Sequence, residues 1–107
     1  MRKKIILLIG SEGLIGKYLK HFYNKKKDVN LVVLDKKKNL DISDRKSLRI
    51  FFKKNNKINY IINASGKNDH ITNNRKKNLF EDDETLNEYL KHNVIGPKNI
   101  IELSIQH

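Results

Sequence analysis

The sequence predicts an α/β fold in which helices flank a partial parallel sheet, and three observations indicate this class. Residues 5–9 are apolar at every position, as in a strand that is buried on both faces. A turn with three glycines follows this run at once. Helical periodicity follows the turn, with one apolar stripe formed by Leu14, Ile15, Tyr18, Leu19, Phe22 and Tyr23.

Length and composition narrow the class of protein. At 107 residues the chain is expected to form a single domain, residues 1–107, with a modest core. It contains no cysteine, so it offers neither a disulfide framework nor a thiolate metal site, and we expect no metal. Residues 5–9 are too short an apolar run for a signal peptide or a membrane span. We therefore expect a cytoplasmic protein without a membrane partner.

The net charge of +11 raises the question of a nucleic-acid partner. The basic residues are mostly lysines in short clusters at the ends of predicted elements, such as residues 25–27 and 36–38. They are not interleaved with exposed aromatic residues, which stacking on bases would need. We therefore expect no nucleic-acid partner and interpret the clusters as solvated charge, some of which could steer an anionic cofactor.

The glycines of the turn are spaced as G-x-x-G-x-x-G, at Gly10, Gly13 and Gly16. A pyrophosphate can bind the N–H groups at a helix N-terminus only where no Cβ blocks its approach. Gly10 would allow the tight turn, Gly13 the approach of the phosphates and Gly16 the packing of helix on strand. An ordinary glycine turn is the alternative, but the strand before it and the helix after it favour a dinucleotide-binding unit.

A second apolar run, residues 31–34, ends on Asp35. A dinucleotide-binding fold has a carboxylate at about this position, where it accepts hydrogen bonds from the adenosine ribose hydroxyls. Such a carboxylate favours NAD over NADP, because the extra phosphate of NADP would meet like charge. Lys36 leaves NADP open, since a lysine beside the ribose could bind that phosphate. A solvated acid at a strand end is the alternative for Asp35.

The next helix is expected over residues 45–55, capped by Ser43 or Asp44. Before the cap, Asp41 and Ile42 form a pair of an acid and an apolar residue. This pair could present its carboxylate to an adenine amino group and its apolar side chain to the adenine ring. Without the flanking pattern, Asp41 would be a turn residue only.

A third strand is expected over residues 60–62, followed by the small residues Asn63, Ala64, Ser65 and Gly66. Small side chains at the carboxyl end of a parallel strand leave space for a flat cofactor. The polar stretch over residues 68–78 is either a substrate lid or merely a mobile loop.

The last helix is expected to run from residues 82–83 to the end of the chain. It contains Pro97, which lacks the N–H that would otherwise bond to the carbonyl of Asn93. A carbonyl released in this way beside a cofactor crevice could hold an ordered water. A simple kink is the alternative.

In this order, the features resemble the N-terminal part of a short-chain dehydrogenase/reductase, over residues 5–104. The glycine spacing is similar to that of the extended, epimerase/dehydratase-like members that modify sugar nucleotides, whereas residues 63–66 resemble the Asn-Asn-Ala-Gly signature of single-domain members. Residues 80–82 with Asn93 more weakly resemble members from bacterial surface-polysaccharide or flagellin-glycan pathways. The resemblance implies a three-layer Rossmann-type fold, βαβαβα, with strand order 3-2-1.

The resemblance also implies a cofactor, NAD with NADP left open, and the residues that hold it. The three glycines would bind the pyrophosphate, Asp35 the ribose and the pair at 41–42 the adenine, while residues 63–66 would wall the cofactor. Asn93 would match the family's active-site asparagine, whose main-chain carbonyl holds a relay water. The candidate cofactor-binding residues are Gly10, Ser11, Gly13, Leu14, Ile15, Gly16, Asp35, Lys36, Asp41, Ile42, Asn63, Ala64, Ser65 and Gly66.

The family's chemistry needs a Tyr-x-x-x-Lys pair on the helix that follows, where tyrosine exchanges a proton with the substrate oxygen. We expect that pair to lie on a later helix outside this chain. The residues four positions after a tyrosine here are Phe22, Lys27, Ala64 and Asn93, and the one lysine among them, Lys27, belongs to the first predicted helix and its connection. The chain would then be the NAD(P)-binding portion of an enzyme that transfers hydride at a hydroxyl or ketone carbon of a sugar-type substrate, inactive alone. A non-catalytic nucleotide-binding or regulatory module that pairs with another subunit is the alternative.

Strand order 3-2-1 would leave the first strand at the edge of the sheet. An unpaired apolar edge strand invites pairing with another chain. We therefore expect self-association, or a partner chain that completes the sheet.

Overall fold

The computed structural model describes residues 3–36, 39–66 and 83–107. The polar loop expected over residues 68–78 therefore lies outside the described residues. The elements follow one another as β1 (Lys4–Ile9), α1 (Leu14–Asn24), β2 (Val29–Leu34), α2 (Arg45–Lys54), β3 (Tyr60–Asn63), α3 (Asp83–Leu90), the π-helical η2 (Lys91–Ile95) and α4 (Gly96–Gln106).

The three strands form a parallel sheet in the order β2-β1-β3. β1 pairs with β2 from Lys4 opposite Val29 to Ile9 opposite Leu34, and its other edge pairs with β3. The predicted class, an α/β Rossmann-type fold with a partial parallel sheet, is confirmed. The predicted strand order 3-2-1 is wrong, because β3 lies beside β1 and not beside β2.

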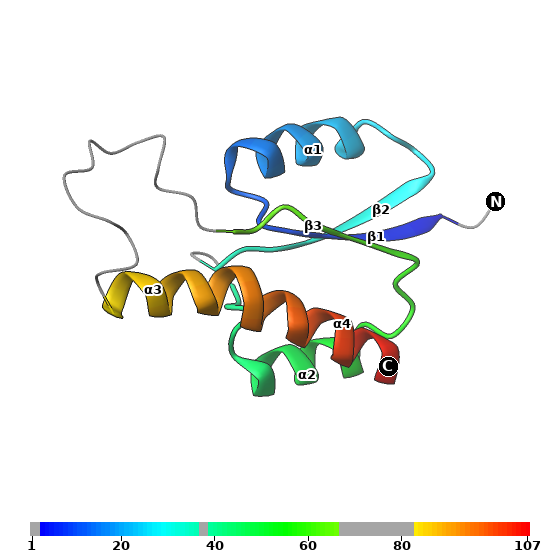
Figure 1. The fold of residues 1–107 in the computed structure, drawn as a ribbon. Coiled ribbons are helices and arrows are strands. Elements are labelled where there is room, and N and C mark those ends of the chain that lie inside the picture. Colours follow the sequence, from blue (N-terminus) through cyan, green and yellow to red (C-terminus); the bar gives the residue numbers. More distant parts are fainter. Residues whose placement is uncertain (1–2, 37–38, 67–82) are drawn as a thin grey trace.

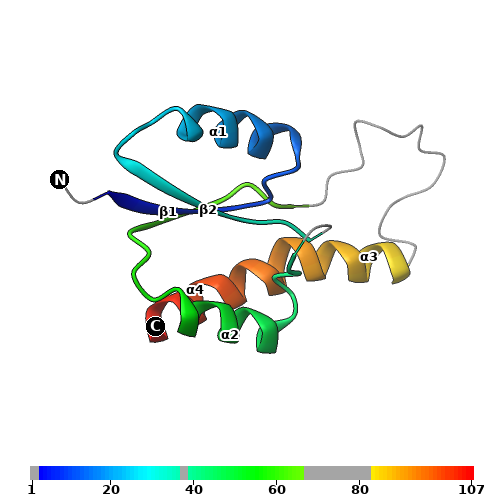
Figure 2. The same ribbon diagram turned by 180° about the vertical axis from the view of Figure 1, so that it is seen from behind.

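The strand order explains how the helices are divided between the two faces of the sheet. The chain moves from β1 to β2 in one direction, and then returns past β1 to reach β3. Because parallel crossovers are right-handed, a reversal of direction carries the crossover helix to the opposite face. Accordingly, α1 covers one face of the sheet, and α2 covers the other together with the helix that ends the chain (Figures 1 and 2).

The main core lies between the sheet and the pair α2 and α4. Its buried members come from the sheet, from the loop before α2 and from the two helices: Leu7, Ile9, Leu34, Ile42, Leu48, Phe52, Ile100 and Leu103. The central position of β1 accounts for its uninterrupted apolar run, since Ile6 to Ile9 are all buried. β1 is thus not an edge strand, and the expectation that its edge drives self-association loses its structural basis.

The opposite face of the sheet is covered less completely. The apolar stripe of α1 includes side chains that remain largely in solvent: Leu14 is 91% exposed, Ile15 65% and Tyr18 69%. Figure 1 shows α1 alone above this face of the sheet. An amphipathic helix normally turns such a stripe toward a core. Here part of the stripe has no described element to pack against.

The helix α2 begins where the sequence predicts and is capped by Asp44. The carboxylate of Asp44 accepts hydrogen bonds from the backbone N–H of Ser47 at 3.2 Å and from the Ser47 hydroxyl at 2.7 Å. The Ser47 side-chain bond, followed by the backbone bond, lowers the pKa of Asp44 below its ordinary value. Of the two predicted capping residues, Asp44 is therefore the one that caps this helix.

The last helix is continuous from α3 through η2 to α4 (Figure 1). In η2 the hydrogen bonds span five residues, as in the bond from the Gly96 N–H to the carbonyl of Lys91. The irregularity ends beside Pro97, which has no N–H to donate. Within the described ranges, no helix combines the length and apolar character that crossing a bilayer requires.

Candidate functional site

A pocket with a volume of about 330 Å³ opens at the carboxyl ends of the strands. It lies where the order β2-β1-β3 reverses direction, the place at which open α/β sheets bind their ligands. The predicted site residues that line it are Gly10, Gly13, Asp35, Lys36, Asp41, Ile42, Ala64, Ser65 and Gly66. The fold thus brings together, at one pocket, predicted residues from four separate segments of the sequence.

The glycine turn is closed tightly against its neighbours. Gly10 has φ +84°, a conformation that side-chain-bearing residues rarely adopt, and a Cβ on it would lie 2.6 Å from the backbone N of Ser65. A Cβ on Gly16 would collide with the carbonyl group of Gly10. By contrast, a Cβ on Gly13 would come no closer than 3.7 Å to the described atoms. Gly13 is the N-cap of α1 and lines the pocket, so its open side faces space that a ligand could fill.

Asp35 links the end of β2 to the glycine turn. Its Oδ2 accepts a hydrogen bond of 3.1 Å from the backbone N–H of Glu12. A backbone bond of 2.8 Å from Gly10 to the carbonyl of Leu34 joins the same two segments. Glu12 also lines the pocket, and its carboxylate lies 3.6 Å from the ammonium group of Lys20. Glu12 and Asp35 therefore lie side by side at the pocket, and the carboxylate of Glu12 is paired with Lys20.

Lys36 is held by residues of the last helix. Its Nζ lies 2.9 Å from Nε2 of His92 and 3.9 Å from Oε2 of Glu88. The same Nε2 of His92 lies 3.1 Å from Glu88. The hydrogen bond with His92, assisted by the charge of Lys36, lowers the pKa of Glu88 below its ordinary value. The ammonium group of Lys36 thus lies beside two side chains of the last helix.

Asp41 and Ile42 form the wall of the pocket nearest α4. Oδ1 of Asp41 accepts hydrogen bonds from the backbone N–H of Ser43 at 2.9 Å and from its hydroxyl at 2.8 Å. Burial acts to raise the pKa of Asp41, but the Ser43 bonds, together with nearby Lys36 and His92, outweigh it and lower that pKa below its ordinary value. Asp41 therefore carries a carboxylate charge at the pocket, and Ile42 belongs to both the pocket and the core.

Small residues after β3 form the opposite wall. Ala64 is fixed to β1 by a bond of 2.8 Å from its N–H to the carbonyl of Ile9. Asn63 does not line the pocket, because its Oδ1 accepts bonds from the N–H and hydroxyl of Ser65. A Cβ on Gly66 would lie 3.3 Å from Oδ1 of Asn93, so the asparagine of the last helix lies beside this wall.

Several predicted residues lie outside the pocket lining. Ser11 is buried behind the turn, Gly16 is packed against it, and Leu14 and Ile15 are exposed on α1. The pocket is also lined by residues that the sequence patterns did not single out: Ile9, Glu12, Leu40 and His92. Glu12 lies inside the glycine motif and His92 directly precedes Asn93. Their positions beside predicted site residues were the sequence features that could have indicated them.

Among the described residues that line the pocket there is no tyrosine, so the Tyr-x-x-x-Lys pair of the resemblance is not found there. Tyr23 and Lys27 have the Tyr-x-x-x-Lys spacing, but Tyr23 lies in the last turn of α1 and Lys27 in the connection that leads into β2, and neither lines the pocket. Within the same described ranges, no group of histidine and acidic side chains is arranged to hold a metal ion.

A glycine turn, an acid after β2 and a pocket at the reversal of strand order define a nucleotide-binding domain of the Rossmann type. The model of the NAD dependent epimerase/dehydratase family matches residues 6–107. The chain belongs to this family, whose members depend on a nicotinamide dinucleotide. A comparison with curated proteins finds no match.

Solved structures with the same fold include the protein lin1944 from Listeria innocua, 23% identical with a TM-score of 0.75 over 95% of this chain and 49% of that one. A dTDP-4-dehydrorhamnose reductase from Clostridium acetobutylicum is 25% identical, with a TM-score of 0.69 over 94% of this chain and 33% of its own. The corresponding reductase from Bacillus anthracis, solved in complex with NADP, is 19% identical, with a TM-score of 0.74 over 97% and 33%. The chain thus spans half or less of the length of these structures.

Proposed function

We propose that the chain is the NAD(P)-binding portion of a short-chain oxidoreductase that transfers hydride at a hydroxyl or ketone carbon of a sugar in surface-glycan biosynthesis. The observation that carries this proposal is the convergence of the glycine turn, Asp35 and Asp41 on one pocket at the carboxyl ends of the strands. Membership of the NAD dependent epimerase/dehydratase family supports it. The likeness to a dTDP-4-dehydrorhamnose reductase supports a sugar substrate.

In this proposal each wall of the pocket binds a different part of the cofactor. The open side of Gly13 and the first N–H groups of α1 bind the pyrophosphate. The carboxylate of Asp35 accepts hydrogen bonds from the adenosine ribose, while Asp41 and Ile42 receive the adenine. The cofactor, when bound, supplies the hydride acceptor or donor.

The charges around the ribose position favour NAD over NADP. A 2′-phosphate would meet the like charge of Asp35, which lines the pocket. Lys36, the cation nearest in sequence, is engaged by His92 and Glu88. NADP remains the second candidate, since the Bacillus anthracis reductase was solved with it. We accordingly expect NAD to bind the isolated chain more tightly.

The pocket lining that the structure describes contains no tyrosine, which supports a chain that is inactive alone. Asn93, which lies beside Gly66 at the pocket, would contribute a main-chain carbonyl for a relay water once a second half is present. The exposed stripe of α1 and the outer edge of β3 are the surfaces that such a half would cover, whether it comes from a partner chain or from a second copy.

A second candidate function is a non-catalytic nucleotide-binding or regulatory module that pairs with another subunit. The partly exposed stripe of α1 favours pairing in either case. The two functions differ in what the completed assembly does: only the oxidoreductase turns over a nicotinamide cofactor. We place both in the cytoplasm, with residues 1–107 as a single cofactor-binding domain.

Calorimetric titration of the 107-residue chain with NAD and with NADP tests the cofactor site. We expect saturable binding that is tighter for NAD and that Asp35→Ala weakens. Asp28→Ala is the matched control, because Asp28 is an exposed acid just before β2, at the opposite end of that strand. Absence of binding by a folded chain would contradict the proposal, as would equal losses in both variants.

A further inference from the structure

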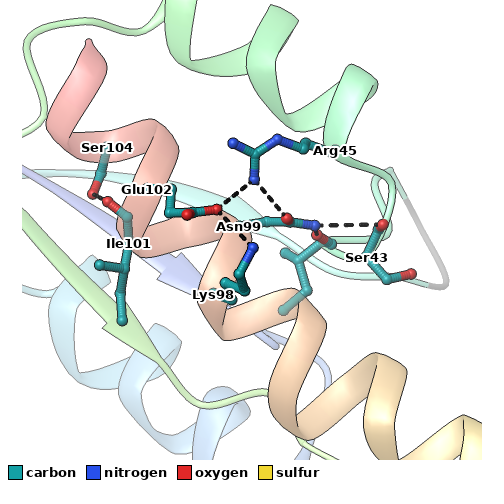
Figure 3. Close-up of polar contacts among 8 residues, drawn as sticks. Ser43, Arg45, Lys98, Asn99, Ile101, Glu102 and Ser104 are labelled. Carbon is teal, nitrogen blue, oxygen red and sulfur yellow. Dashed lines mark hydrogen bonds and ion pairs between the residues drawn. The ribbon is translucent and has the colours of Figure 1, made fainter.

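A buried polar contact joins α4 to the loop that carries Asp41 and Ile42. Asn99 is only 4% exposed, and its Nδ2 donates to the carbonyl of Ile42 at 3.0 Å and to that of Ser43 at 3.4 Å (Figure 3). Both partners are carbonyl oxygens, which can only accept. The amide nitrogen of Asn99 must therefore face the loop.

A second set of charges fixes the other side of the same amide. Oδ1 of Asn99 accepts a bond of 3.0 Å from Nη1 of Arg45, in the first turn of α2. The same Nη1 lies 2.8 Å from Oε1 of Glu102, which also accepts from Lys98 at 3.1 Å (Figure 3). Arg45 thus prevents the amide from turning over, because a flipped amide would bring its N–H groups against the guanidinium.

The side chain of Ile42 is held by the same helix. A Cβ on Gly96 would lie 2.6 Å from Cδ1 of Ile42, so this side chain rests directly against the helix backbone. Gly96 and Asn99 are one turn apart on α4 and hold the side chain and the carbonyl of the same residue. The position of the pocket wall at Asp41 and Ile42 is therefore set from α4.

We propose that Asn99 is a positioning residue that determines which nucleobase the pocket accepts. It holds the Asp41 loop at the depth at which the Asp41 carboxylate accepts a hydrogen bond from an exocyclic amino group. A base with a carbonyl oxygen at that position is rejected, since two acceptors would face each other. This inference rests on the proposed cofactor site, in which the same loop receives the adenine.

The test compares NAD with nicotinamide hypoxanthine dinucleotide, which replaces the adenine amino group by a carbonyl. Calorimetric affinities for both are measured with the full chain, with Asn99→Asp and with Ser104→Ala. Asn99→Asp keeps the size of the side chain but removes both donors. Ser104→Ala is the control on the same helix, because the Ser104 hydroxyl bonds only to the Ile101 carbonyl among the described groups.

We expect the unmodified chain and Ser104→Ala to prefer NAD, and Asn99→Asp to lose about fivefold of that preference, the change that corresponds to one hydrogen bond. If Asn99→Asp does not fold, Arg45→Gln, which leaves the amide free to turn, is expected to narrow the same ratio. Equal weakening of both dinucleotides in a folded variant would overturn the inference, because a purely structural role lowers both affinities alike. Failure of the unmodified chain to bind either dinucleotide would instead overturn the proposed function itself.

Discussion

The backbone N–H of Glu12 donates to Oδ2 of Asp35 over 3.1 Å, so the glycine turn after β1 and the acid after β2 form one structural unit. An acid at this position therefore has two tasks, since it orders the turn and borders the pocket. A substitution can be chosen that separates them.

Asp35→Asn keeps an oxygen for the Glu12 N–H but removes the charge, whereas Asp35→Ala removes both. We expect Asp35→Ala to weaken NAD binding by about tenfold or more, the effect of losing hydrogen bonds to a charged group. Asp35→Asn is expected to lose less affinity for NAD and to bind NADP relatively better, because the repulsion of the 2′-phosphate falls. Calorimetric titration with both cofactors checks this, and unchanged NADP affinity in Asp35→Asn would contradict it.

Substitutions of Gly13 and Gly16 should separate an effect on cofactor binding from an effect on the stability of the fold. Gly16→Ala is expected to cost about 1–3 kcal/mol of unfolding free energy or more, because its Cβ would collide with the Gly10 carbonyl. Gly13→Ala is expected to cost no more than about 1 kcal/mol, because its Cβ has room and only the N-cap preference for glycine over alanine is lost.

Gly13→Ala should nevertheless weaken NAD binding, because its methyl group would occupy the space proposed for the pyrophosphate. Denaturant unfolding and cofactor titration of the two variants provide the comparison. A Gly13→Ala chain that is stable and binds NAD as before would argue against a pyrophosphate at this turn.

Acid stability should depend on two carboxylates. Hydrogen bonds from Ser47 lower the pKa of Asp44 below 3.8, and the Arg45 and Lys98 bonds lower that of Glu102 below 4.5. Because these pKa values are lower in the folded chain than in the unfolded chain, the two carboxylates stabilise the folded chain at pH values above their ordinary pKa values. This contribution is lost as the pH falls through the folded values.

Unfolding free energy measured from pH 7 to pH 2 should therefore decline below about pH 4.5. The double variant Asp44→Asn with Glu102→Gln should be less stable at neutral pH and show a shallower decline. An identical slope in both proteins would remove these carboxylates as its source.

The exposed apolar stripe of α1 predicts that copies of the chain associate through it, and that its side chains contribute little to the stability of the fold. Ile15→Gln with Tyr18→Gln should reduce the concentration dependence of sedimentation, because both side chains are mostly in solvent. Unfolding free energy should change by no more than about 0.5 kcal/mol. Leu48→Ala, a fully buried contrast, is expected to cost about 2–5 kcal/mol. Unaltered sedimentation of the double variant would indicate that another surface, such as the β3 edge, mediates association.

Local patterns predicted the elements of this fold well, but not their order in the sheet. The apolar run of β1, the Asp44 cap and the start of α2 depend on neighbouring residues, so the sequence specifies them directly. The side of β1 on which β3 pairs depends on long-range packing that a four-residue strand does not encode. One signal was present: a run as uniformly apolar as β1 suits a central strand better than an edge.

The site shows the same division. The glycine motif and the acids could be identified because their spacing along the chain reflects one local geometry. Leu103 and Asn99, which pack α4 against the rest, were not foreseen, because the π-helical stretch interrupts the periodicity on which a stripe is counted. His92 reaches the pocket from the same irregular stretch.

The π-helical stretch Lys91–Ile95 amounts to an insertion of one residue into an α-helix. Each residue of an α-helix advances about 100° around the axis, so an extra residue in a regular helix would turn α4 away from the sheet. The bulge absorbs this rotation and keeps α3 and α4 in phase. Deletion of Val94, which is 53% exposed, should therefore yield an unbroken α-helix with both faces unchanged, provided that Pro97 is replaced as well, since a regular helix has no room for its ring.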